Sequence, residues 1–360
     1  MKKIIWIIGL IVVVVVIILI SSKRGNREQK VKVEEIVGAG ATFPYPFYDK
    51  IFNIYSKKTG VKINYQAIGS GGGIRQLLNK TVDFGATDAF MSDEEMKKAE
   101  KEIIHIPTCL GAVVVAYNLP GNPELKLTPE VIADIFLGKI KKWNDEKIKE
   151  LNPDINLPDL NITVVRRSES SGTTFIFTDF LSKVSAEWKN KVGRGKVVKW
   201  PVGLGAKGNP GVAAMIKQTP GAIGYIEFTY ASQNNIPFAS IKNKSGNFIK
   251  PDIESISKAA AIELPPDTRI SITNTESPDG YPISSFTWII VYKEQNYNNR
   301  EKEKAIELVK LLWWIIHEGQ KYTKSLHYAP LPPNAVKTAE ENIKSITYNG
   351  KSIMEELLQK

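Results

Sequence analysis

Cysteine and histidine are nearly absent from this sequence of 360 residues, which holds one Cys and three His. The single thiol, Cys109, cannot form an intramolecular disulfide, and it cannot supply a multi-cysteine zinc or iron–sulfur site. The histidines, His105, His317 and His327, show no HExxH or similar metal-ligand spacing. We therefore expect no disulfide framework, no metal site and no cofactor.

No long basic run with interleaved aromatic residues occurs, although the net charge is +10, from 48 Lys and Arg against 38 Asp and Glu. The acidic residues are spread along the chain, so a groove that follows a nucleic-acid backbone is not expected. The length that remains after residues 1–24 corresponds to about two domains of roughly 150 residues each. Composition therefore indicates a two-domain globular protein without a nucleic-acid partner.

One long apolar run is present, and it lies at the N-terminus. Ile4 to Ile20 contains only Ile, Val, Leu, Trp and Gly, and two lysines precede it, as in a secretory signal. Its 17 residues are also close to the length that spans a bilayer, so an uncleaved transmembrane anchor stays open. We expect residues 1–24 to be a signal peptide or anchor, residues 25–33 a linker, and the rest a periplasmic or other extracytoplasmic body.

The remaining chain alternates β-rich runs with amphipathic stretches, which predicts an α/β fold with a largely parallel sheet. The expected strands are Val61–Ile68, Ile103–Tyr117 with a break at Pro107, Ile162–Val165, Ala222–Glu227 and Phe286–Tyr292. Apolar residues at helical spacing predict helices around Tyr48 to Tyr55, Ile74 to Val82, Phe177 to Val184 and Ala305 to Gly319. The Gly- and Pro-rich segment Gly203–Gly211 predicts a connection.

Three of the expected helices begin with Gly, Ser and Thr. Two flexible glycines and Thr42 precede the first helix, Ser70 and three glycines precede the second, and Ser171, Gly172 and Thr173 open the third. A helix N-terminus has unpaired N–H groups and about half a positive charge, so it binds anions. Each motif alone is typical of an ordinary N-cap. Three in one chain favour an anion held by several helix N-termini, and the lack of GxxxxGK[ST] argues against a P-loop nucleotide site.

Asp88 follows a short expected strand at what should be the same edge of the sheet. Alone, it is equally typical of a turn or helix cap. A carboxylate beside a bound anion is repulsive unless the anion donates a proton, and phosphate keeps a proton up to about pH 6 or slightly above. Sulfate does not, so Asp88 would favour phosphate. Arg166 or Arg167 could contact the oxyanion while Glu169 moderates its charge, although both could also form a surface pair.

These residues lie in motifs that closely resemble the periplasmic phosphate-binding protein of the bacterial phosphate-specific ABC transporter. The resemblance runs from about Val37 to the C-terminal region. The motifs are, in chain order, Gly38-Ala-Gly-Ala-Thr-Phe-Pro, Ile68-Gly-Ser-Gly-Gly-Gly, Val82-Asp-Phe-Gly-Ala-Thr-Asp-Ala, Leu137-Gly-Lys-Ile-Lys-Lys-Trp-Asn, Val164-Val-Arg-Arg-Ser-Glu-Ser-Ser-Gly-Thr-Thr-Phe and Pro220-Gly-Ala-Ile-Gly-Tyr-Ile-Glu.

The resemblance implies a two-lobed α/β periplasmic binding protein of type II-like fold, with the ligand in the cleft between lobes. Lobe 1 would comprise residues 34–108 and 282–360, and lobe 2 residues 109–281, with crossings near Pro107–Ala112 and Tyr281–Phe286. The phosphate-binding residues it implies are Ala41, Thr42, Phe43, Ser70, Asp88, Arg167, Ser171, Gly172 and Thr173. Asp88 would accept the proton of phosphate. Glu169 and Ser170 depart from the family's usual Asp and Gly.

The function that the resemblance implies is non-enzymatic: a monomeric receptor would bind inorganic phosphate and deliver it to the ABC transporter permease subunits in the membrane. It would have no catalytic residue and would close around its ligand by a hinge motion. One alternative is an exported hydrolase of phosphate or acyl esters that uses Ser70 or Ser171 with a histidine, although neither serine lies in GxSxG. Another is a binding protein for a different protonated oxyanion, such as arsenate or an organophosphate.

Overall fold

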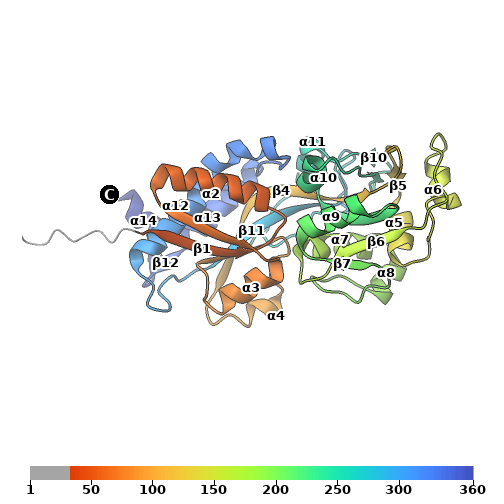
Figure 1. Cartoon of the computed structure of the whole chain (residues 1–360). Helices are drawn as coiled ribbons and strands as arrows, with labels where there is room; N and C mark the ends of the chain where they lie inside the picture. Colours follow the sequence, from red (N-terminus) through yellow and green to blue (C-terminus); the bar gives the residue numbers. More distant parts are fainter. Residues whose placement is uncertain (1–32, 360) are drawn as a thin grey trace, which may run out of the picture. The chain divides into compact units, whose positions relative to one another are not determined.

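A computed structural model describes residues 33–359 of the chain (Figure 1). The expectations for the apolar segment of residues 1–24, and for the linker up to residue 32, lie outside this range. In the described part, eight strands form one sheet in the order β2-β1-β3-β11-β4-β8-β6-β7. Their bounds are β1 (Glu35–Gly40), β2 (Lys62–Ala67), β3 (Phe84–Thr87), β4 (Ile103–Tyr117), β6 (Thr163–Arg167), β7 (Leu204–Ala206), β8 (Ala222–Glu227) and β11 (Ser284–Tyr292).

Helices flank this sheet, and two small sheets complete the described part. The longer helices are α2 (Tyr45–Thr59), α3 (Ser70–Leu78), α5 (Pro129–Phe136), α7 (Gly172–Val184), α9 (Gly208–Gln218), α12 (Lys302–Ile316) and α13 (Pro333–Lys344). The short ones are α4 (Asp93–Met96), α6 (Glu146–Leu151), α8 (Ala186–Lys191), α10 (Phe228–Gln233), α11 (Ile253–Ala259), α14 (Ile353–Leu358) and the 3-10 turns η1 (Glu318–Tyr322) and η2 (Lys324–Leu326). The small sheets contain β5 (Lys126–Leu127), β9 (Ser240–Lys242) and β10 (Phe248–Ile249), and β12 (Thr347–Tyr348) and β13 (Lys351–Ser352).

The long strand β4 joins two groups of strands. Its first ten residues, Ile103 to Ala112, pair antiparallel with β11, which in turn pairs with β3, while Val113 to Tyr117 pair antiparallel with β8. Within each group the other pairings, β1 with β2 and β3, and β6 with β7 and β8, are parallel. We call β1–β3 with β11 the first strand group and β6–β8 the second. Both groups have parallel strands whose carboxyl ends precede helices, the arrangement that places ligands at strand ends in α/β proteins.

The expected break at Pro107 is wrong, since β4 runs through it. Proline cannot donate to a ladder and is tolerated in a strand interior where the pairing is irregular. Here the register with β11 shifts between Thr287 and Trp288, which lie opposite Cys109 and Pro107, so Thr108 is the extra residue of a bulge. The bulge accommodates the proline without ending the strand.

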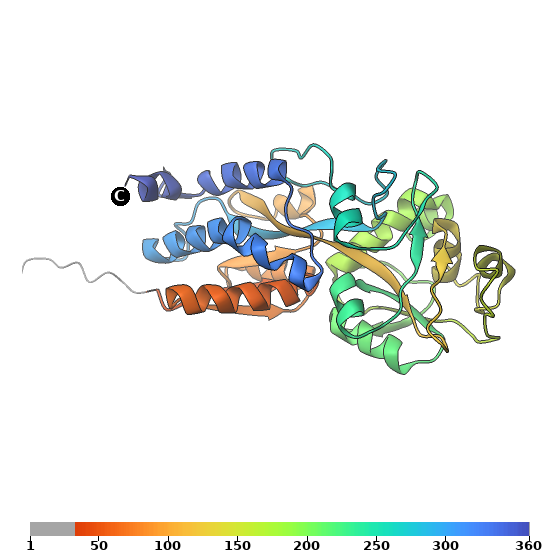
Figure 2. The same cartoon turned by 90° about the horizontal axis from the view of Figure 1, so that it is seen from above.

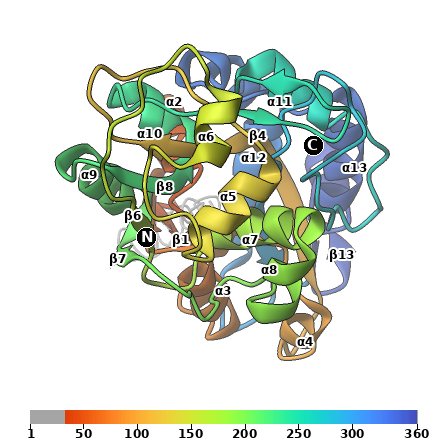
Figure 3. The same ribbon diagram turned by 90° about the vertical axis from the view of Figure 1, so that its right-hand side faces the viewer.

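Apolar helix faces cover both sides of the first strand group. Figure 1 shows α2 and α3 on opposite faces of β1, and Figure 2 shows α2, α12 and α13 lying side by side. The expected stripe of α2 is buried from Phe47 to Tyr55, and the Tyr55 hydroxyl reaches across to donate to Glu307 Oε1 on α12 at 2.6 Å. In the second strand group, α7 and α9 flank β8 (Figure 3).

Three local expectations needed correction. Gly38 and Gly40 are not a flexible helix entry, because both lie in β1, where the ring of Phe84 leaves no room for a Cβ at Gly38. Val82 is buried but lies beyond the end of α3 at Leu78. The Gly203–Gly211 segment is not only a connection, since it contains β7 and the first residues of α9. At Gly38 and Gly40 the glycines allow close approach in the sheet, which a flexibility argument misses.

Candidate functional site

The first expected helix start places Thr42 and Phe43 between β1 and α2. Thr42 is 5% exposed and Phe43 is fully buried. The neighbouring Ala41 uses its amide to donate to the Ala86 carbonyl at 2.9 Å, and its own carbonyl accepts from the Tyr65 hydroxyl at 2.7 Å. Ala41 therefore anchors the loop to β3, and its N–H is not a free donor in this structure.

The second helix start contains Ser70, the first residue of α3, after Gly69 with φ +90°. The Ser70 Oγ accepts from the Asp88 amide at 3.1 Å and donates to Asp88 Oδ2 at 3.3 Å. Asp88 directly follows β3 and is 2% exposed. The serine and the carboxylate, expected from separate motifs, thus form one buried unit.

The third helix start is capped as expected. The Ser171 Oγ accepts from the Thr174 amide at 3.1 Å, and Gly172 and Thr173 occupy the first turn of α7. The amides of a first turn have no intrahelical acceptor, so those of Gly172 and Thr173 can serve a ligand. A Cβ built on Gly172 would lie 2.4 Å from Ser70 Oγ and 2.7 Å from Asp88 Oδ2. The start of α7 therefore lies directly against the pair formed by the other strand group.

Burial dominates the electrostatics of Asp88. Loss of water raises the pKa of its carboxyl from 3.8 to about 7, against hydrogen bonds from Thr287 and Ser70 and the charge of Arg167, which lower it. The Thr287 hydroxyl donates to Oδ1 at 2.8 Å from β11. Asp88 is thus a carboxylate that can accept or hold a proton near neutral pH.

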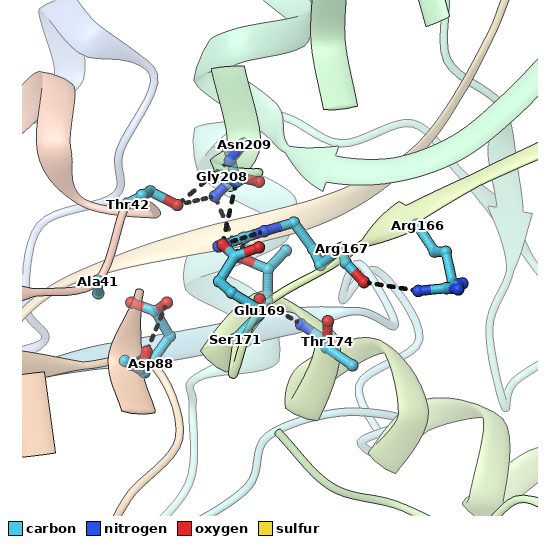
Figure 4. A network of polar contacts seen from close by, with 12 residues as sticks. Ala41, Thr42, Asp88, Arg166, Arg167, Glu169, Ser171, Thr174, Gly208 and Asn209 are labelled. Carbon is cyan, nitrogen blue, oxygen red and sulfur yellow. Dashed lines mark hydrogen bonds and ion pairs between the residues drawn. The ribbon is translucent and has the colours of Figure 1, made fainter. Parts of the chain in front are cut away.

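Arg167 supplies the positive charge of the cluster. It ends β6, is 3% exposed, and donates from Nη1 to Thr173 Oγ1 at 3.1 Å and from Nε to Glu169 Oε1 at 2.9 Å. Its Nη2 also contacts Glu169 Oε1, which in addition accepts from the Gly208 amide at 3.0 Å. Although burial opposes ionisation, the hydrogen bonds from Arg167 lower the pKa of Glu169. The residue pattern alone left the choice between Arg166 and Arg167 open, and the family resemblance implied Arg167. Figure 4 shows Arg166 turned away from this cluster.

Two polar residues of the cluster were missed by sequence reasoning. Asn209, fully buried on α9, donates from Nδ2 to Thr42 Oγ1 at 3.0 Å (Figure 4). The same Nδ2 donates to Thr173 Oγ1 at 3.1 Å. Thr287 lies in a long apolar strand far along the chain. The only feature of the nearby sequence that could have pointed to Asn209 is the pair of glycines that flank Asn-Pro in Gly208–Gly211. No feature of the nearby sequence points to Thr287.

The histidines lie elsewhere. His105 Nε2 accepts from the Met91 amide, His317 bonds to Glu340 and the Trp313 carbonyl, and His327 bonds to Ser232. None of these hydrogen bonds reaches Ser70 or Ser171. The arrangement that a serine hydrolase would need, a base within hydrogen-bond reach of its nucleophile, is not formed by these three residues.

Comparison with known proteins places this geometry in context. A family model described as a PBP superfamily domain matches residues 25–312. The phosphate-binding protein PstS of Pasteurella multocida is 44% identical over 320 residues, which cover 87% of this chain and 91% of that protein. PstS of Methanocaldococcus jannaschii is 40% identical over 324 residues, which cover 83% of this chain and 82% of that protein.

Solved structures share the fold at lower identity. A high-affinity periplasmic phosphate-binding protein, PfluDING, bound with phosphate, matches with a TM-score of 0.68 and 22% identity, over 85% of this chain and 93% of that chain. A putative phosphate ABC transporter substrate-binding protein from Clostridium perfringens, with bound phosphate, matches with a TM-score of 0.61 and 18% identity, over 83% and 100%.

Proposed function

The chain belongs to the PBP superfamily and, within it, to the family of PstS phosphate-binding proteins, and from this premise we propose that it binds inorganic phosphate outside the cytoplasm and delivers it to the permease subunits of an ABC transporter. The fold is that of a two-lobed α/β binding protein with a ligand cleft. The proposal is carried by one observation: three helix starts and Arg167 lie together in a buried cluster that also contains the carboxylate of Asp88.

The donor set suits an oxyanion. Helix-start amides, the hydroxyls of Thr42, Ser171 and Thr173, and the guanidinium of Arg167 can all donate to a ligand, and charge-assisted bonds of this kind are the strong ones. Asp88 accepts, so it would repel an anion that carries no proton. A ligand with one proton and several bare oxygens satisfies both parts, and phosphate near neutral pH is such a ligand.

Closure between two lobes remains a proposal, with lobe 1 at residues 34–108 and 282–360 and lobe 2 at 109–281. It is supported by the change of partner along β4 after Ala112 and by the start of β11 at Ser284. Contacts between the strand groups include the Gly71 amide to the Ser170 carbonyl at 3.1 Å and the ion pair of Lys196 with Glu95 at 2.6 Å. Such contacts form only when the two sides approach, as in hinge closure around a ligand.

We propose that the protein lies outside the cytoplasm, that it is a monomer, and that it has no enzymatic activity. None of the helices in residues 33–359 is long and apolar enough to cross a bilayer. The apolar run Ile4 to Ile20 supports export. N-terminal sequencing of the mature protein distinguishes a cleaved signal from a retained anchor, and incubation with a chromogenic phosphate ester tests for hydrolysis, which we expect to be absent.

Titration calorimetry with phosphate and sulfate, between about pH 5 and about pH 9, tests the proposed function directly. Phosphate should bind one to one, and sulfate should not compete. Sulfate affinity comparable to that for phosphate would contradict the acceptor role of Asp88, and the absence of phosphate binding would contradict the function itself. Arsenate, which resembles phosphate in size and protonation, is the third ligand to titrate.

Replacing Gly172 by Ala should weaken phosphate binding by about 10- to 100-fold, because overpacking of this size typically costs 1–3 kcal/mol. The added Cβ would meet Ser70 Oγ at 2.4 Å and hold the start of α7 away from α3. Alanine is a better helix former than glycine, so the fold should be retained.

The matched control for Gly172→Ala is Gly211→Ala, which adds the same methyl group in the first turns of α9. Its Cβ would make an ordinary contact, 3.7 Å from Ala206, so its phosphate affinity should stay within about threefold of wild type. Calorimetric titration of both variants makes the comparison. Equal affinities for Gly172→Ala and Gly211→Ala would rule out close contact between α7 and Ser70 in the bound state.

A further inference from the structure

We propose that Asn209 is a positioning residue that fixes the hydroxyls of Thr42 and Thr173 as obligate donors and thereby leaves Asp88 as the acceptor for the ligand's proton. This inference rests on the proposed binding of phosphate. It concerns the direction in which two hydroxyl protons point, which decides whether a threonine donates to an oxyanion or accepts from it.

The orientation of the Asn209 amide is set by its neighbours. Its Oδ1 accepts from the backbone N–H of Glu227 at 2.9 Å, and an N–H can only face the carbonyl end of the amide. The NH₂ end therefore points to the two threonines, at 3.0 Å from Thr42 Oγ1 and 3.1 Å from Thr173 Oγ1. Both protons of that NH₂ group are used in these two bonds.

Each threonine oxygen accepts a second bond. Thr173 Oγ1 also accepts from Arg167 Nη1 at 3.1 Å, and Thr42 Oγ1 also accepts from the backbone N–H of Asn209 at 3.3 Å. A hydroxyl has two lone pairs and one proton. Because N–H donors occupy both lone pairs, each hydroxyl can make a further hydrogen bond only by donating its own proton.

The two hydroxyl protons lack acceptors within the protein. In the part of the chain that the structure describes, no hydrogen bond runs from the hydroxyl of Thr42 or Thr173 to a protein atom, although the residues are 5% and 0% exposed. Buried donors without a partner are costly, and a bound ligand would satisfy both of these hydroxyls. The ligand atoms they suit are unprotonated oxygens.

The consequence is a site with a defined place for one proton. Thr42 and Thr173 donate to ligand oxygens, as do Arg167 and the helix-start amides, and Asp88 accepts. Thr42 lies after β1, in the first strand group, whereas Thr173 and Asn209 belong to the second. Asn209 therefore sets the polarity of donors on both sides of the cleft at once.

The test is a set of phosphate titrations on Asn209→Ala in three backgrounds: wild type, Thr173→Ser and Thr173→Val. Serine keeps the hydroxyl and valine keeps the shape without it. We expect Asn209→Ala to weaken binding by about tenfold or more in the first two backgrounds, the usual size of a hydrogen bond to a charged group. In Thr173→Val the loss should be at least about threefold smaller, because one of the two oriented hydroxyls is already gone.

A Thr42→Val/Thr173→Val background extends the cycle, and there Asn209→Ala should cost about twofold or less. These backgrounds keep Arg167, Asp88 and the helix-start amides, so binding is measured at raised phosphate concentrations. Thermal unfolding midpoints without phosphate, well above the titration temperature, show that each variant is folded.

Equal losses in all backgrounds would overturn the proposal, since Asn209 would then act by packing or by closing the cleft. The proposal is supported if the loss of phosphate affinity caused by Asn209→Ala becomes smaller as the hydroxyls of Thr173 and Thr42 are removed. If the wild-type protein binds no phosphate at all, the proposed function fails, and the role of Asn209 fails with it. The two failures are therefore distinguished by the wild-type titration alone.

Discussion

The Asp88→Asn protein should bind sulfate and lose its preference for phosphate. Asparagine offers an NH₂ group where the carboxylate accepted, so phosphate loses a charge-assisted bond, and sulfate no longer meets a negative charge. We expect phosphate affinity to fall about 10- to 100-fold and sulfate binding to become measurable. Calorimetric titration with both anions at about pH 8 checks this. Unchanged affinity and selectivity would remove Asp88 from the site.

The same substitution should stabilise the ligand-free protein at high pH. Burial raises the pKa of Asp88 from 3.8 to about 7, so the folded state holds this proton more tightly than the unfolded chain. Wild-type stability therefore falls as the pH rises from about 4 to about 7, by about 4 kcal/mol in total. Asparagine does not ionise and avoids this loss. Urea unfolding should show a gain for Asp88→Asn at about pH 8 and similar stabilities at about pH 4; similar values at both would contradict the shift.

The Arg167→Ala protein should lose phosphate binding by about 100- to 1,000-fold or more. Arg167 is buried. Three of its five N–H groups donate to Glu169 and Thr173, which leaves two for a ligand. Truncating one partner of a buried, hydrogen-bonded charge pair costs 2–5 kcal/mol or more. The loss includes the unpaired carboxylate of Glu169, whose negative charge would then face the anion.

Two variants control the Arg167 result. Arg166→Ala removes a neighbouring arginine whose Nη1 donates to the Arg167 carbonyl at 3.3 Å, outside the cluster, so its affinity should stay within about threefold of wild type. Arg167→Lys keeps the charge without the planar fork and should lie between wild type and alanine. Equal titration curves for Arg166→Ala and Arg167→Ala would mean that the arginine acts through overall charge.

Local chemistry explains why much of the site could be predicted from the sequence. Ser171 caps α7 through a bond three residues away, and Ser70 opens α3, so both positions follow from capping and glycine preferences. Asp88 was expected at the end of a short strand and lies there. These residues depend on neighbours in the chain.

The remaining parts depend on tertiary neighbours. Asn209 matters because Thr42 and Thr173 lie beside it, and Thr287 because β11 pairs with β3; neither contact leaves a trace in the nearby sequence. The same reason explains the bulge at Thr108, since whether Pro107 ends a strand is decided by the partner strand. The sequence pattern predicts the helix starts, but it does not predict the residues that orient their side chains.

The pairing of β4 with β11 also sets the order in which the molecule can be assembled. Strands β6, β7 and β8 and the last residues of β4 come from one continuous stretch, so their contacts can form early. The first strand group needs β11, which is synthesised only after everything from β5 to β10. Long-range pairing of this kind is slow to form. Until β11 arrives, Asp88 lacks the Thr287 hydroxyl, so the acceptor of the site is completed last.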